Sequence, residues 1–144
     1  MISYSQARYI VTEISRIPFY QQMIAEYQAE LTELKQKKES LSEPKSPNGK
    51  TSIGEGRGNE VTDFSNRLLD LIVRQDELEQ EQYNFVKAEK RAEAYLEILL
   101  KSHDAEYAEA YFHTRDKREL HERFAISNAY DRMIRVVRNN IRRL

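Results

Sequence analysis

The sequence predicts an all-α protein: a long antiparallel helical hairpin, or coiled-coil-like stem, followed by a small C-terminal helix-turn-helix. Three observations predict this. All four glycines and two of the three prolines lie within residues 42–60, which leaves the remaining chain free to form uninterrupted helix. Outside that segment, apolar residues recur in alternating steps of three and four, the spacing of one helix face. The C-terminal region combines short helical patterns with an excess of basic residues.

The first helix is expected to begin near Ser3. Ser3 and Gln6 have the spacing of a capping box, and Ile10 and Ile14 follow at helical intervals. Pro18 interrupts this pattern. It either kinks one helix or opens a second.

Two seams of regularly spaced residues predict the paired helices of the stem. The first seam consists of Tyr20, Ile24, Tyr27, Leu31, Leu34, Lys38 and Leu41. The second helix is expected to start at Thr62 or Asp63 and to end near Ser102. Its seam consists of Phe64, Leu68, Leu71, Gln75, Leu78, Gln82, Phe85, Glu89, Ala92, Leu96 and Leu99. Because a loop separates the two seams, the simplest arrangement folds them back as an antiparallel hairpin.

Two features of the second seam leave alternatives open. Its polar members, Gln75, Gln82 and Glu89, fall one heptad apart. They either fix the register of the pair or mark a side that faces solvent or a short partner, and we favour the second interpretation. The apolar stripe also widens at Leu69, Ile72 and Val73. This widening predicts a covering surface, supplied by the N-terminal helix or by a second subunit.

The segment 42–60 is rich in Ser, Pro, Gly and Asn, with Ile53 as its one aliphatic anchor. It cannot bury enough apolar surface to offset the entropy of ordering, so we expect a flexible loop. The glycines do not match a phosphate-binding loop, because Pro44 stands five residues before Gly49, where that motif requires Gly.

The C-terminal region predicts three short helices. Asp104 is the expected cap of a helix that contains Tyr107. A second helix follows, in which Leu120 and Phe124 share a face. The third is expected to start at Ser127, which would cap it, and to continue to the C-terminus. Two short helices joined by a few residues, the second edged with arginine, are typical of a helix-turn-helix.

Charge supports a DNA-binding function for this region. Residues 113–144 contain nine Lys or Arg and four Asp or Glu, a net charge of +5, although the whole chain has a net charge of −1. A basic end on an acidic stem can hold a phosphate backbone. The predicted DNA-binding residues are Arg118, Ser127, Asn128, Ala129, Asp131, Arg132, Arg135, Arg138 and Arg142. Those from position 128 to 132 would lie nearest the base edges, and the later arginines would contact phosphates.

The same region and the rest of the chain leave few other functions open. The basic helix could instead be an amphipathic helix packed on the stem, since arginine is favoured at helix C-termini.

Catalysis is not expected: the chain has no cysteine, and its three histidines lack the spacing of a helical metal pair. We therefore expect no enzyme, no cofactor and no metal site. We also expect no membrane segment, because the apolar runs are too short, and a cytoplasmic location.

The C-terminal stretch AYFHTRDKRELHERFAISNAYDRMIRVVRNNIRRL is similar to the end of sigma-factor region 4 and of the phage ArpU/RinA-type late transcriptional regulators. The shared features are a Tyr-Phe phrase, an acidic and basic helix, an Ile-Ser turn and an Arg-rich final helix. The opening MISYSQARYIV is also similar to the start of such phage proteins. The chain departs from the pattern at His113-Thr114, where Gly usually follows Tyr-Phe, and at Phe124-Ala125, where Leu-Gly is usual.

The resemblance implies a phage or prophage regulator that binds promoter DNA and activates late genes together with host RNA polymerase. The expected organisation is a helical stem over residues 1–103 and a helix-turn-helix DNA-binding domain over residues 104–144. The expected partners are double-stranded DNA, a second copy of the chain and RNA polymerase. The alternative is a non-enzymatic coiled-coil interaction module, with the basic tail as a second contact surface.

Overall fold

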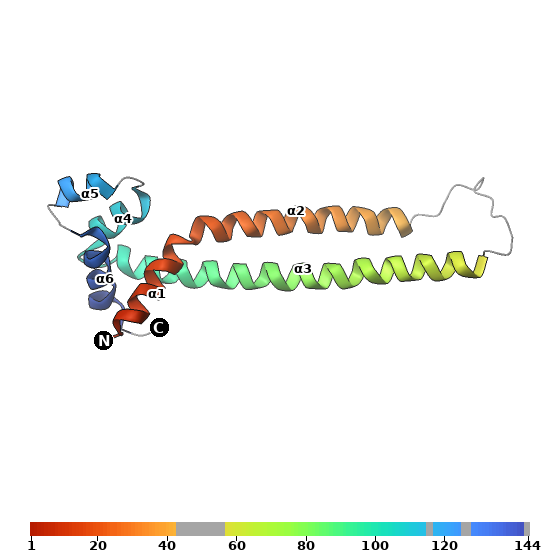
Figure 1. Cartoon of the computed structure of the whole chain (residues 1–144), viewed down its shortest axis with the longest axis horizontal. Helices are drawn as coiled ribbons and strands as arrows, with labels where there is room; N and C mark the ends of the chain where they lie inside the picture. The colour runs from red at the N-terminus through yellow and green to blue at the C-terminus, as the bar shows by residue number, and fades with distance from the viewer. Residues whose placement is uncertain (43–56, 115–116, 125–127, 143–144) are drawn as a thin grey trace. The chain divides into compact units, whose positions relative to one another are not determined.

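The computed structural model describes residues 1–42, 57–114, 117–124 and 128–142 (Figure 1). All regular structure in these ranges is α-helical, which confirms the predicted fold class. The helices are α1 (Tyr4–Ser15), α2 (Ile17–Ser42), α3 (Arg57–Leu100), α4 (Ala105–His113), α5 (Lys117–Phe124) and α6 (Ala129–Asn140). Within the described residues, no helix has the length and apolarity needed to cross a bilayer.

The chain divides into two compact units. The terminal unit comprises Met1–Gln21 and Val86–Leu144, and the hairpin unit comprises Gln22–Phe85. This division differs from the boundary expected at residue 104, because α1 and the last part of α3 belong with α4, α5 and α6. The physical reason is a common core, in which Ile10 of α1 and Leu99 of α3 are fully buried together with the C-terminal helices.

The start of the chain follows the sequence-based expectation closely. The side-chain hydroxyl of Ser3 accepts a hydrogen bond from the backbone N–H of Gln6, and the Gln6 side chain accepts one from the backbone N–H of Ser3, so the capping box is confirmed. Helix α1 ends at Ser15, and α2 begins at Ile17. Pro18 therefore lies in the first turn of a second helix, where the missing N–H of proline costs little.

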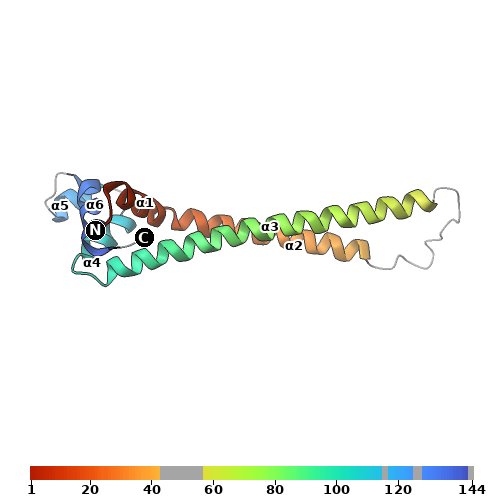
Figure 2. The same ribbon diagram turned by 90° about the horizontal axis from the view of Figure 1, so that it is seen from below.

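Within the hairpin unit, α2 and α3 run side by side (Figure 2). Leu34 of α2 and Leu78 of α3 are buried. The rings of Tyr27 and Phe85 stack with centroids 5.7 Å apart. All four residues are members of the predicted seams, so the heptad pattern identified the contacting faces.

The polar members of the seam meet polar partners on the opposing helix. The Lys38 ammonium donates to Gln75 Oε1 at 2.8 Å, and Gln82 Nε2 donates to the backbone carbonyl of Ile24 at 3.3 Å. Both glutamines are half-buried. Lys38, the one charged residue of the first seam, thus faces Gln75, a polar residue of the second seam. This matching supports register selection over the solvent-facing interpretation that we favoured from the sequence.

The widened apolar stripe is solvent-exposed in the described part of the chain. Leu69, Ile72 and Val73 are 57%, 39% and 49% exposed. The covering surface that the sequence predicts is therefore not supplied by the described residues of the hairpin unit.

The predicted loop 42–60 is partly helical. Helix α2 extends to Ser42, and α3 begins at Arg57, several residues before the expected start at Thr62 or Asp63. The remaining part of that prediction, residues 43–56, lies outside the described residues.

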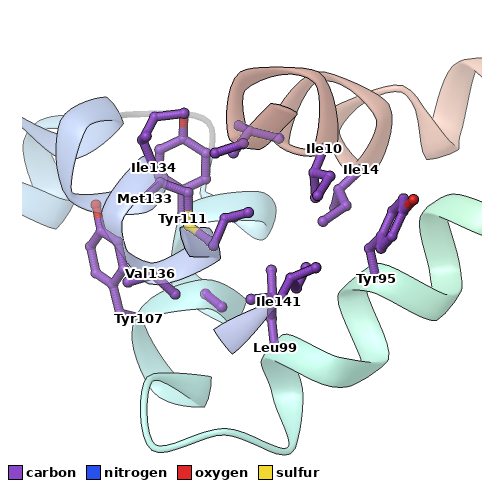
Figure 3. Packing of buried hydrophobic residues seen from close by; sticks show 14 of the residues in the cluster. Ile10, Ile14, Tyr95, Leu99, Tyr107, Tyr111, Met133, Ile134, Val136 and Ile141 are labelled. Carbon is purple, nitrogen blue, oxygen red and sulfur yellow. The ribbon is translucent and has the colours of Figure 1, made fainter. Parts of the chain in front are cut away.

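The core of the terminal unit is a single cluster drawn from five helices (Figure 3). It includes Ile10 and Ile14 of α1, Tyr95 and Leu99 of α3, Tyr107 and Tyr111 of α4, Leu120 of α5, and Met133, Ile134 and Val137 of α6. Helix α1 runs antiparallel to α6, since Arg8 meets Tyr130 and the Ile2 carbonyl meets Arg138. Closing this core therefore requires both ends of the chain.

Candidate nucleic-acid interface

The last two helices are separate elements that pack on each other. Helix α5 ends at Phe124, and α6 begins at Ala129. Leu120 of α5 is buried, and the rings of Phe124 and Tyr107 form a T-shaped contact with their centroids 5.1 Å apart. A continuous helix through this region would have excluded a helix-turn-helix arrangement. The break that the motif requires is present.

Asn128, rather than Ser127, caps α6. The Asn128 side chain accepts a hydrogen bond from the backbone N–H of Asp131 at 3.1 Å. The predicted cap at Ser127 is therefore corrected, and Ser127 itself lies outside the described residues. Asparagine is as effective as serine at this position, so residue type alone does not distinguish the two adjacent positions, and the sequence analysis considered only Ser127. The helix also ends at Asn140, earlier than expected.

Helix α6 is packed on more than one flank and leaves one narrow face to solvent. It contacts α1, α4 and α5. Ala129, Met133, Ile134, Val136 and Val137 are buried. The exposed side chains on α6 and its cap are Asn128, Asp131, Arg135 and Asn139. Their spacing of three and four residues places them on one face of the helix.

Ala129 does not fit its predicted role near the base edges. It is only 6% exposed and belongs to the core cluster. Its backbone carbonyl accepts a hydrogen bond from the Tyr107 hydroxyl at 2.6 Å. Ala129 therefore anchors the first turn of α6 to α4 and presents no side chain to a ligand.

Arg132 is held against aromatic rings. Its guanidinium carbon lies 4.8 Å from the ring centroid of Tyr107 and 6.0 Å from that of Phe124, and the residue is half-buried. Such cation–π contacts are worth about 0.5–2 kcal/mol, depending on desolvation. Arg132 thus contributes to packing between α6, α4 and α5, which the sequence pattern did not indicate.

The other predicted arginines differ in their surroundings. Arg135 is exposed and makes no hydrogen bond or ion pair with the described part of the chain. Arg138 is half-buried, and its Nε donates to the backbone carbonyl of Ile2 at 3.2 Å. Arg118 on α5 is exposed. Arg142 is also exposed, but it lies beyond the end of α6, after Ile141, whose backbone is extended.

Two residues at this surface were missed by the sequence analysis. Asn139 shares the exposed face of α6. Arg8 of α1 is exposed, and its Nε donates to the Tyr130 hydroxyl at 3.2 Å. The helical spacing from Arg135 could have identified Asn139. No local signal could have identified Arg8, because the contact joins positions 122 residues apart in the chain.

The burial of Tyr107 leads to a pH-dependent prediction. Burial raises the pKa of Tyr107 to about 12. The unfolded chain loses this proton near pH 10, so the stabilisation by the neutral phenol is complete below pH 10 and is lost as pH rises through about 12. The free energy of unfolding, measured with urea at a series of pH values, should therefore fall less steeply between about pH 10 and 12 in Tyr107→Phe than in the wild type. If the two proteins lose unfolding free energy equally steeply with pH, the raised pKa of Tyr107 is contradicted. At neutral pH, loss of the bond to Ala129 should cost about 1 kcal/mol.

The described residues do not assemble a metal site. No group of three or more His, Asp or Glu side chains is placed to hold a metal ion among them. The depression beside α4 and α5 is lined by Glu106, Glu109, His113, Thr114 and Arg123, and within it Glu106 already pairs with Arg123 at 2.9 Å.

No protein-family model, curated protein or solved structure matches the chain.

Proposed function

We propose that the protein binds double-stranded DNA and that α6 is the helix that enters the major groove. The observation that carries this proposal is the exposure pattern of α6. The helix is fixed by contacts with three other helices, yet Asp131, Arg135 and Asn139 face solvent along its length. A rigidly held helix with one free polar face is what groove recognition needs, because the side chains must meet base edges in a defined register.

The residue types on this face suit base recognition. An arginine can donate two hydrogen bonds to guanine, an asparagine can pair with adenine, and a carboxylate can accept from cytosine. Arg135, Asn139 and Asp131 supply these three chemistries. Arg135 is therefore proposed to contact a base, which revises the phosphate contact predicted for it from the sequence. Each good pair discriminates against a wrong base by roughly 1–3 kcal/mol. Arg118 and Arg142 are proposed to contact phosphates, which position the protein without reading sequence.

The more detailed proposal is a phage or prophage regulator that binds promoter DNA, activates late genes with host RNA polymerase, and acts as a dimer. The resemblance of the final 35 residues to sigma-factor region 4 and ArpU/RinA-type regulators supports it, together with the separate α5 and α6 helices that such a motif requires. Dimeric helix-turn-helix proteins read two half-sites, so the operator is expected to be a near-palindrome.

The test is DNA binding by the full chain as a function of salt. Fluorescence anisotropy with duplexes that tile the region flanking the gene should find one preferred site. The affinity for that site should fall steeply between about 50 and 200 mM salt, because phosphate contacts release counterions. Equal affinity for every duplex would contradict sequence-specific recognition, and no binding at low salt would contradict the proposal as a whole.

A second candidate function rests on a different surface. Leu69, Ile72 and Val73 form an exposed apolar patch on α3, in the hairpin unit. Adjacent exposed aliphatic residues on a helix are a common feature of protein-interaction surfaces. We propose an interaction module on this patch as the alternative function. It becomes the leading one if the full chain fails to bind duplex DNA.

A further inference from the structure

We propose that Arg8 of α1 contacts the DNA phosphate backbone beside α6, so that the N-terminal helix is a second element of the nucleic-acid interface. This inference rests on the proposed function. It adds a helix from the opposite end of the chain, and a residue that the sequence pattern did not indicate.

The position of Arg8 relative to α6 is the first support. Its Nε donates to the hydroxyl of Tyr130, which lies in the first turn of α6 between Ala129 and Asp131. Asn128 and Asp131, from the same turn, are on the exposed face. A duplex that reaches the leading turn of α6 therefore comes close to the Arg8 guanidinium.

The state of the Arg8 guanidinium is the second support. Its carbon lies 5.8 Å from the centroid of the Tyr4 ring, and its Nε is bound by Tyr130. Both of these partners are phenol side chains, and no carboxylate forms an ion pair with the Arg8 guanidinium among the described residues. The positive charge is thus held in place by a hydroxyl and an aromatic ring of the described chain, and it remains available to a phosphate.

The amphipathic pattern of α1 is the third support. Ala7, Ile10, Val11 and Ile14 are buried in the core, which fixes the rotation of the helix. Tyr4 and Arg8, one turn apart, are both exposed. An arginine ordered by one Nε bond keeps its terminal N–H groups for a second acceptor, and phosphate oxygens match that geometry.

The test measures the salt dependence of DNA binding by the full chain carrying Arg8→Gln. This substitution removes the charge but keeps an N–H donor of similar reach. For one phosphate contact, the slope of log affinity against log salt should become shallower by about 0.9, equally on the preferred and on unrelated duplexes. At low salt the affinity should fall roughly 3- to 10-fold. Arg8→Lys should retain most of the binding, because the charge is kept.

The matched control is Arg91→Gln, which makes the same charge change at an exposed position of the same unit. If log affinity falls equally steeply with log salt for Arg8→Gln and Arg91→Gln, Arg8 contributes only to the overall positive potential of the protein. The inference is then wrong. Circular dichroism melts establish that both variants are folded. If the wild type binds duplex DNA and Arg8→Gln behaves as the control does, this inference fails alone. If the wild type binds no duplex, both proposals fall.

Discussion

Residues 104–144, produced as a separate fragment, are expected to remain largely unfolded. The fragment contains α4, α5 and α6 but lacks α1 and the end of α3, which supply Ile10, Ile14, Tyr95 and Leu99 to the common core. Burial of one such side chain contributes roughly 1.5–3 kcal/mol, so the loss of all four is comparable to the total stability of a typical small domain. Circular dichroism should show weak helicity and no cooperative thermal transition.

The matched control is a shortened chain that lacks the hairpin unit instead. Joining Gln21 to Val86 by a short Gly/Ser linker deletes residues 22–85 and keeps every residue of the terminal core. The ends to be joined are close, since Gln21 Nε2 lies 3.5 Å from Glu89 Oε1. This shortened chain is expected to melt cooperatively. If the 104–144 fragment folds and the shortened chain does not, the division into terminal and hairpin units is wrong.

Arg135→Ala is expected to weaken binding to the preferred duplex by roughly 10- to 100-fold while leaving stability unchanged. The loss corresponds to the roughly 1–3 kcal/mol of one bidentate base contact. Arg135 is exposed and makes no hydrogen bond or ion pair with the described part of the chain, so its removal breaks no such contact. Anisotropy titrations should also show relaxed preference at one base position, with little change on unrelated duplexes.

The control for this variant is Arg67→Ala, at an exposed position of the hairpin unit. It should bind DNA almost as the wild type does. Arg132→Ala is a poor test of base recognition, because Arg132 packs on Tyr107 and Phe124 and its loss should also lower the melting temperature. If Arg135→Ala binds as tightly as Arg67→Ala, α6 is not the reading helix.

Local patterns in the sequence carried enough information to predict several features of this fold. The heptad spacing identified the facing residues of α2 and α3, because a residue every three or four positions must lie on one side of a helix. The capping box at Ser3 was also predictable, since both partners lie within one turn. The break between α5 and α6 followed from the short apolar patterns on either side.

The candidate site was less predictable for a geometric reason. An amphipathic pattern marks the buried stripe of a helix but does not say how many neighbours cover it. Helix α6 contacts three helices, so Ala129 is buried, Arg132 is packed and Arg138 is bound to the Ile2 carbonyl. A helical wheel could not separate the packed Arg132 and Arg138 from the exposed Arg135, because all three arginines lie outside the apolar stripe.

The sequence by itself determined the helices, their approximate ends, the seams of the hairpin and the basic character of the C-terminal region. Only the tertiary structure decided that α1 runs antiparallel to α6 and that the first and last helices share one core. Helix formation depends on neighbours within a turn or two, whereas burial of apolar surface is non-directional and accepts any complementary partner. Which partner closes the core therefore emerges only when the whole chain has folded.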